Sequence, residues 1–499
     1  MTLRDQLTPL RERLTTAVRK RVEIDARSLA AFRMALGLLI LADLLSRFRN
    51  LTAFYTDVGV YPRAAFVAHQ NPLHLSFHVV SGEVWVQALL FALAGVFAIA
   101  LAIGYRTPVA TVGSWLFLVS LHNRVPDVLN GGDFLLRLLL FWALFLPLGG
   151  RWAIDAIQTG RRRNHVTSVA SAALMLQVVI VYTANVIAKY SGDVWLQGNG
   201  LAYVFSLGQF TILLGDHLGA YPTLLRVLNY LWLGTITLSF LLIVLTGIRR
   251  AVFVFLLMAM HLGMLVTMRI DLFPLISVAS LIPFLPASFW TFLGGRYTGS
   301  GVRAASRTWA GRLARALPTA RTVGGSPLLG RAKRGLLTAV PLFFLVLIVL
   351  WNVHLGLSYA YDADVLPDEA EAIIDVSRTD QYWNMFAQDP LSTDGWVVAP
   401  GKLANGSRVD AFHGGAVTWD RPPDISDTYP TARWRKYLVR LWRYDTADRS
   451  LFAEYLCRRW NENQGTELDN VSVYFMEQPT RIHTDTEPIN KVHLVSHRC

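Results

Sequence analysis

One lysine stands apart in this chain because of where it lies. Lys189 is the only lysine between Lys20 and Lys333, although the chain has 47 Lys and Arg residues. It ends a long apolar run, in the segment ANVIAKYSGDVW. A lysine amine can lose its proton when it is removed from water, whereas arginine stays charged, so Lys189 is a candidate catalytic base. The alternative is an amine that reaches lipid headgroups from the end of a helix.

Other ionisable side chains lie within apolar runs, where a charge is costly and therefore often functional. The segment NGGD, from Asn130 to Asp133, opens one such run, and Arg137 follows one helical turn later. Asp133 and Arg137 are expected to pair on one helix face, which is more often a structural than a catalytic arrangement. His261 stands alone on an apolar face before Arg269, and such a histidine is more often part of the core than a catalyst. No His-Glu-x-x-His or paired-cysteine motif occurs, so no metal is expected.

The composition defines the broad class of the protein. Hydrophobic residues make up 53% of the 499 residues and charged residues 16%. This balance predicts an α-helical multi-pass membrane protein. Apolar runs long enough to cross a bilayer predict about nine spans. They lie near residues 29–46, 84–104, 106–122, 133–149, 166–189, 223–247, 250–269, 271–290 and 336–356.

The basic residues predict the orientation, because cytoplasmic loops accumulate Lys and Arg. The N-terminal segment 1–28, the loop around Arg161, the turn at Arg249 and the loop 291–335 are basic and alternate correctly. We expect the N-terminus in the cytoplasm and residues 357–499 outside the cell membrane. Since topology accounts for the basic residues, the net charge of +12 gives no reason to expect a nucleic-acid partner.

The part of the chain after the last span is predicted to be a small extracytoplasmic α+β domain. Residues 352–499 hold 15 Lys and Arg against 22 Asp and Glu, a net charge of −7. Short apolar alternations such as WVVAP and VSVYFME predict strands, and residues 431–461 a helical stretch. The two cysteines, Cys457 and Cys499, either form a disulfide on the oxidising side of the membrane or stay unpaired.

The predicted orientation brings polar segments of separate helices to one face. The fifth span runs outward and places Lys189 at the outer interface, the fourth begins there with NGGD, and the seventh ends there near Asp271. We therefore expect these three clusters to meet at the outer end of the helices.

Several blocks of the chain, in order, resemble the horizontally transferred transmembrane (HTTM) domain family, which includes the vitamin K-dependent γ-carboxylase. The blocks are ARSLAAFRMALGLLILADLL, YTDVGVYP, HNRVPDVLNGGDFLLRLLLFWALFLPLG, NVIAKYSGDVW, HLGMLVTMRIDLFP, QYWNMFAQDP and DGWVVAPG. The resemblance implies an HTTM-like transmembrane domain over residues 29–290, followed by the basic loop 291–335 and a last helix at 336–356.

The resemblance also implies a cofactor, a reduced quinone of the vitamin K type. In the carboxylase, a lysine that follows an alanine and precedes an aspartate and a tryptophan is the base towards this quinol. Ala184, Lys189, Asp193 and Trp195 match the pattern approximately, and His261 matches a histidine that precedes Phe-Pro.

One motif departs from the carboxylase. Gly131 and Gly132 stand where the carboxylase has an Asn-His pair. This chain therefore lacks the help that such a histidine would give in positioning the quinone.

Two hypotheses of function follow. The first is a quinol-oxidising enzyme of the carboxylase or epoxidase type, embedded in membrane lipid, whose outer domain presents a protein substrate. Its catalytic residues would be Lys189, His261 and Asp133. Its quinone- or substrate-binding residues would be Asn130, Arg137, Asp193, Trp195 and Arg269. The alternative is a non-catalytic membrane protein, a lipid-binding or assembly module that keeps the fold.

Overall fold

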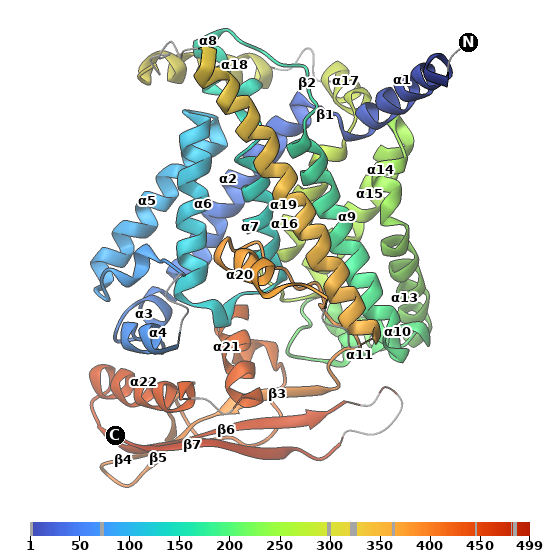
Figure 1. Ribbon diagram of the computed structural model, residues 1–499. Coiled ribbons are helices and arrows are strands. Elements are labelled where there is room, and N and C mark those ends of the chain that lie inside the picture. Colours follow the sequence, from blue (N-terminus) through green and yellow to red (C-terminus); the bar gives the residue numbers. More distant parts are fainter. Residues whose placement is uncertain are drawn as a thin grey trace.

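A computed structural model describes residues 3–69, 74–296, 301–319, 327–361, 365–444, 447–480, 482 and 487–499. The protein is a bundle of long helices with a sheet domain at one end (Figure 1). The longer helices outside the sheet domain are α1 (Leu3–Val22), α2 (Ala26–Phe48), α5 (Val84–Ile103), α6 (Thr107–Arg124), α7 (Gly131–Ala143), α9 (Val169–Tyr190), α13 (Pro222–Thr237), α15 (Gly247–Thr267), α18 (Gly301–Ala316) and α19 (Pro327–Tyr361).

Shorter elements join these helices. The short helices are α3 (Leu51–Tyr55), α4 (Arg63–His69), α8 (Ile154–Thr159), α10 (Asp193–Leu196), α11 (Gly200–Ser206), α12 (Gly215–Leu218), α14 (Leu241–Val244), α16 (Phe273–Leu281), α17 (Ala287–Arg296) and α20 (Asp368–Val376). Strands β1 (Ile24–Asp25) and β2 (His165–Val166) pair at the end of the bundle that lies away from the sheet domain (Figure 1).

Six helices of the described residues are long and apolar enough to cross a membrane. They are α2, α5, α9, α13 continued through α14, α15 and α19. Phe273–Phe284 and Ala287–Gly295 form a pair bent by 99°, which would be a seventh span if it is counted as one. The expected third and fourth spans are α6 and α7. The 13 residues of α7 extend about 20 Å, less than the roughly 30 Å of a hydrocarbon core.

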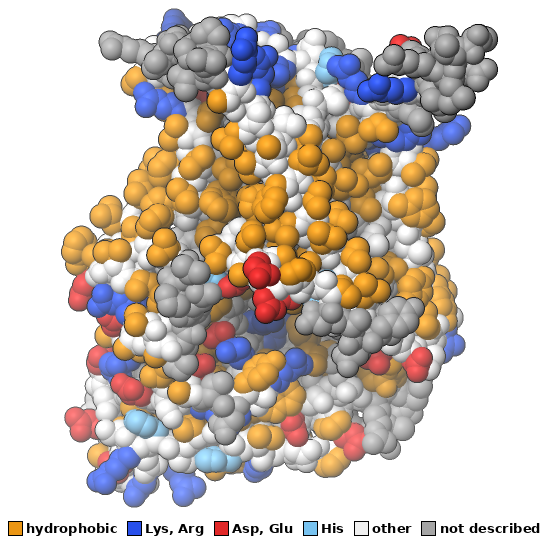
Figure 2. Space-filling model, viewed as in Figure 1, with side chains coloured by type: hydrophobic (Ala, Val, Ile, Leu, Met, Phe, Trp, Pro, Cys, Tyr) orange, Lys and Arg blue, Asp and Glu red, His pale blue; other side chains and the backbone are white. Residues whose placement is uncertain are grey.

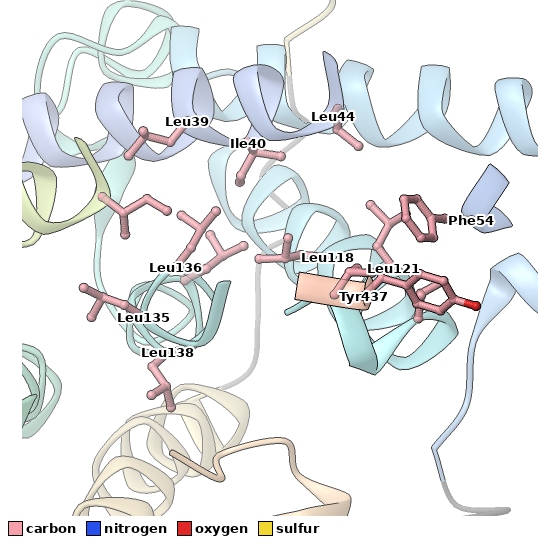
Figure 3. Packing of buried hydrophobic residues seen from close by; sticks show 14 of the residues in the cluster. Leu39, Ile40, Leu44, Phe54, Leu118, Leu121, Leu135, Leu136, Leu138 and Tyr437 are labelled. Atoms are coloured by element: carbon pink, nitrogen blue, oxygen red, sulfur yellow. The ribbon is translucent and has the colours of Figure 1, made fainter. Parts of the chain in front are cut away.

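Helix α7 is short because it is an internal element of the bundle. It packs against α2, α6, α9 and α16. Figure 3 shows Leu136 of α7 directed towards Leu39 and Ile40 of α2, within one buried cluster that also contains Leu135. A helix covered by protein on every side can be apolar all round without facing lipid.

The basic segments lie together at the end of the bundle away from the sheet domain (Figure 1). Arg250, at the start of α15, donates to the carbonyl oxygen of Arg21 at 3.0 Å. Gln158 of α8 donates to the carbonyl oxygen of Ala314 in α18, also at 3.0 Å. Figure 2 shows a broad band of hydrophobic side chains between this end and the sheet domain. The alternation of basic segments expected from the sequence is therefore present in the fold.

The C-terminal region has the predicted α+β composition. Its strands are β3 (Thr393–Val398), β4 (Pro400–Leu403), β5 (Arg408–Asp410), β6 (Leu468–Pro479) and β7 (Asn490–Arg498), all antiparallel to their neighbours. The long strand β6 pairs with β3 and β4 along one edge and with β7 along the other. Helices α21 (Ala432–Arg443) and α22 (Asp448–Asn463) occupy the stretch predicted to be helical.

The two cysteines form a disulfide, which resolves the two alternatives. Cys457 of α22 bonds to Cys499 after β7, and their Cα atoms are 5.4 Å apart. The bond closes a loop over a sequence separation of 42 residues and ties a helix to the sheet edge.

This disulfide leads to a stability prediction. Cys499→Ser should destabilise the sheet domain by about 2–4 kcal/mol, because a loop of this length no longer restricts the unfolded chain. Chemical unfolding in detergent, followed by tryptophan fluorescence, measures the change. Reduced wild-type protein is the control and should unfold like the variant. An unchanged midpoint relative to oxidised protein would contradict the prediction.

Candidate functional site

Helix α9 positions Lys189 as the last of several polar side chains on one face. Gln177, Asn185 and Lys189 are spaced by eight and four residues, so they share a side of the helix. Ser168 begins α9 with a capping box, in which Ser168 and Ser171 bond each other's backbone amides. This polar face is buried and does not point to lipid.

The polar face of α9 holds an extended segment, residues 377–392, which we call the connector because it joins α20 to β3. The Gln177 side-chain amide donates to Gln381 Oε1 at 2.7 Å. The Asn185 side-chain amide donates to the Trp383 carbonyl oxygen at 2.6 Å. A non-helical backbone inside a helix bundle needs such donors, because its carbonyl groups have no partners of their own.

Lys189 continues this pattern at the end of the helix. Its side chain is 2% exposed, and Nζ donates to the carbonyl oxygens of Met385 at 3.2 Å and Phe386 at 3.1 Å. Nζ also lies 3.4 Å from the ring centroid of Trp195, whose Nε1 donates to the same Phe386 oxygen. The amine thus lies inside the protein, so the alternative of an amine among lipid headgroups is wrong.

Lys189 and Trp195 line a cavity of about 990 Å³. This volume is at the upper end of the range for small-molecule sites, roughly 300–1,000 Å³. The connector and the starts of α7 and α10 form one part of the wall. Leu231, Trp232, Leu256 and Met260 of α13 and α15 form an apolar part, and α21 forms a third part.

The start of α7 brings Asn130 and Gly131 to the same cavity. Asn130 caps the helix, because its Oδ1 accepts from the backbone amides of Gly132 and Asp133. A Cβ atom added at Gly131 would overlap the Met385 side chain, whose Sδ is the nearest atom. The Met385 side chain therefore fills the space that a larger residue at position 131 would need.

His261 lies behind this cavity. Its Nε2 is 2.9 Å from the Tyr182 hydroxyl, and the ring is buried. It borders a second, much smaller cavity that shares Asn185, Trp232 and Phe273 with the large one. His261 is therefore one layer of side chains away from the space beside Lys189.

Asp133 and Arg137 do not form the pair that the sequence predicts. Arg137 binds Asp380 of the connector at 2.9 Å. Asp133 faces α2 and α21, and its Oδ2 accepts from the Asn130 backbone amide at 2.8 Å. Spacing of four residues allows a pair, but here partners from distant parts of the chain bind both side chains.

Asp133 belongs to a buried group of charges that we call the ion cluster, made of Asp43, Arg47, Asp133, Asp271 and Arg433. Arg433 of α21 binds Asp43 at 2.6 Å, Asp133 at 3.2 Å and Asp271 at 3.2 Å. Arg47 of α2 binds Asp43 at 2.7 Å and Asp133 at 2.5 Å. Burial and the charge of Arg47 oppose a charged Arg433, yet the three carboxylates raise its pKa above the usual value.

Two carboxylates of the ion cluster, together with the neighbouring His122, have the composition of a metal site. Asp43, His122 and Asp133 offer ligand atoms within 4.8 Å of one another. All four carboxylate oxygens already accept hydrogen bonds from Arg47, Arg433 or the Asn130 amide. Two guanidinium groups thus supply the positive charge that a metal ion would bring, and these residues do not fit a metal.

The remaining predicted site residues lie at the edge of this region. Asp193 is exposed at the start of α10. Arg269 donates to the carbonyl oxygens of Ser426 and Pro430 and so joins the end of α15 to the sheet domain. Of the predicted residues, the structure brings Lys189, Trp195 and Asn130 together at the cavity, and it places Asp133 and Asp271 in the ion cluster.

Several residues of the site were not singled out from the sequence. They are His122, which is buried at the end of α6, together with Asp380, Arg433, Arg435 and Lys436. The segment RWRK at 433–436 could have indicated this site from the sequence. Arg433 and Arg435 are two residues apart, so on a helix they face different sides and one of them must turn towards the interior.

Apolar helices of spanning length, joined to a small C-terminal α+β domain, fit an integral membrane protein. The chain belongs to the HTTM domain family, whose model matches residues 22–290. No solved structure matches the chain. The matched region contains Lys189, Asp133 and His261, whereas the connector and α21 lie beyond it.

The ion cluster gives a prediction with a control on the same helix. Arg433→Met should destabilise the protein by about 3–5 kcal/mol, because it leaves buried carboxylates without their partner. Arg440→Gln removes the ion pair between Arg440 and Asp127, in which the arginine side chain is 37% exposed. This control variant should lower the free energy of unfolding by only about 0–1 kcal/mol, because water screens an exposed ion pair. Unfolding midpoints in detergent measure both, and equal losses would contradict the role of the ion cluster.

Proposed function

We propose that this HTTM protein is a membrane enzyme that binds a reduced quinone of the vitamin K type in the large cavity and oxidises it, with Lys189 as the base. The observation that carries the proposal is the burial of Lys189 on the wall of an apolar cavity. The family match supports it, since residues 22–290 include the lysine.

The residues of the cavity suit a quinol. A quinol is apolar apart from its two hydroxyl groups and reaches a protein from the bilayer, so it needs an apolar wall and a polar contact at one end. Trp232, Leu256 and Met260 provide the wall, and Asn130 and Lys189 lie in the polar part. A base must hold its place without its proton, and no carboxylate of the described residues forms an ion pair with Lys189 to oppose that.

In this proposal the protein supplies the base that accepts a proton from the quinol. A reduced quinone, when bound, can react with oxygen to give its epoxide and water. Lys189 would accept the proton of a quinol hydroxyl, and Asn130 would orient the ring. Because Met385 occupies the space beside Gly131, where the carboxylase has its Asn-His pair, the proposal covers quinol oxidation and does not include carboxylation of a protein substrate.

The proposal also includes an orientation in the cell membrane. The basic end, with α1 and α18, would face the cytoplasm, and the sheet domain would lie outside. The disulfide between Cys457 and Cys499 supports this orientation, because disulfides persist in oxidising compartments. The cavity would then open in the outer half of the bilayer, where the sheet domain could present a partner protein.

A second candidate function is a non-catalytic lipid-binding module. One observation favours it, the coordination of Lys189 by two carbonyl oxygens and the face of Trp195. An ammonium group has three donors and is attracted to an aromatic ring, so this arrangement suits a charged lysine that fastens the connector.

Lys189→Arg separates the two functions, since arginine keeps the charge and the donors but cannot serve as a base. We expect it to lower epoxide formation by at least roughly 100-fold, the usual effect of losing a general base. The assay supplies phylloquinol and oxygen to purified protein in nanodiscs and measures the epoxide by mass spectrometry. Quinone binding, measured in parallel, should remain.

Lys333→Arg is the matched control, because Lys333 lies in α19 at the basic end of the chain. It should leave epoxide formation unchanged. Full activity of Lys189→Arg would overturn the role of Lys189 as base. A wild-type protein that forms no epoxide above background, yet carries bound lipid, would favour the second candidate.

A further inference from the structure

One face of α21 forms a basic stripe on the wall of the large cavity. Ala432, Arg435, Lys436, Val439 and Arg443 line the cavity, at the spacing of three and four residues that defines one helix face. The opposite face of α21, with Trp434, Tyr437, Leu438 and Leu441, is buried in the core. Figure 3 shows Tyr437 next to Leu121 and Phe54, which fixes the rotation of the helix.

The three cations of the stripe differ in how they are held. Arg435 donates to the carbonyl oxygens of Gln209 at 2.6 Å and Arg269 at 2.9 Å, and it lies 4.0 Å from the ring centroid of Phe210. Lys436 has no hydrogen bond or ion pair with any described residue. Lys436 and Arg443 are exposed on the wall of the cavity, where a ligand can reach them.

The positive charge of this wall is not balanced by the cavity itself. Among the described residues that line the cavity, Asp389 is the only acid. Its Oδ1 accepts from the backbone amide of Val194 at 3.1 Å, so it is engaged at the start of α10. Three cations on one helix face repel one another, and an anionic ligand would offset that cost.

A quinol does not account for the stripe, because its hydroxyl groups carry no formal charge. The rest of the wall specifies the other part of a ligand. Leu231 of α13 and Leu256 of α15 line the cavity and are 59% and 48% exposed. Because both side chains are exposed and also line the cavity, the cavity continues to the surface between α13 and α15.

We propose that the cavity binds an amphiphile whose anionic headgroup, a phosphate or a carboxylate, is held by Arg435, Lys436 and Arg443, with its aliphatic chain along α13 and α15. An acidic peptide would use the same cations but would leave the apolar wall without a partner. Binding of this amphiphile does not require a reaction of the quinol, so the proposed anion site and the role of Lys189 are tested independently.

The test measures ligand binding to the full chain in a neutral detergent by native mass spectrometry and by the shift of the thermal unfolding midpoint. The probes are oleate, dioleoylphosphatidylglycerol and dioleoylphosphatidylcholine. We expect the first two to bind and the third to bind at least tenfold more weakly. Comparison of oleate with the phosphatidylglycerol identifies whether a carboxylate or a phosphate is preferred.

Variants assign the binding to the stripe. Lys436→Gln combined with Arg443→Gln should weaken binding of both anionic probes at least tenfold, whereas Lys436→Arg should retain it. Lys402→Gln removes an exposed lysine of β4 and is the matched control, which should bind as the wild type. If the double variant does not fold, Lys436→Gln alone provides the test, together with the preference of the wild type for anionic over zwitterionic headgroups.

Three results would overturn the proposal. They are equal binding of the phosphatidylcholine and the phosphatidylglycerol, unchanged binding by the folded double variant, and displacement of oleate by a soluble glutamate-rich peptide that has no aliphatic chain. The last result would assign the stripe to an acidic peptide.

Discussion

The ion cluster is the constraint on which the rest of the structure depends, because it fastens the sheet domain to the helix bundle. Arg433 comes from α21, Asp43 and Arg47 come from α2, and Asp133 comes from the start of α7. A buried charge without a partner costs several kcal/mol, so each of these groups requires the others to be in place. Misplacing any one helix would leave a charge exposed to an apolar interior.

The position of the cavity follows from the contact that the ion cluster makes between α21 and the helix bundle. With Arg433 directed into the ion cluster, Arg435 two residues later turns to the other side of α21 and lines the cavity, and Lys436 lines the cavity next to it. The connector then passes from α20 to β3 across the polar face of α9, where Gln177, Asn185 and Lys189 bind it. The cavity is thus enclosed by the matched HTTM region on one side and by later parts of the chain on the other.

Lys189 illustrates how one side chain can serve both fold and site. The amine fastens the connector through the carbonyl oxygens of Met385 and Phe386, and it also forms part of the cavity wall. Its rarity in an arginine-rich chain has a physical reason in either function. As a base, a lysine amine can lose its proton, which arginine effectively cannot, and as a structural contact it directs up to three donors from a single nitrogen at the two carbonyl oxygens.

What the sequence by itself determined is local. The apolar runs predict the long helices, NGGD predicts the start of α7, and the alternation near the C-terminus predicts strands, because each depends on residues a few positions apart. Only the tertiary structure decided the partners. Asp133 binds Arg433, 300 residues away, instead of Arg137, and His261 lies behind the cavity. Helix packing brings such groups together, and a periodic pattern contains no information about which distant charge will arrive at a given face.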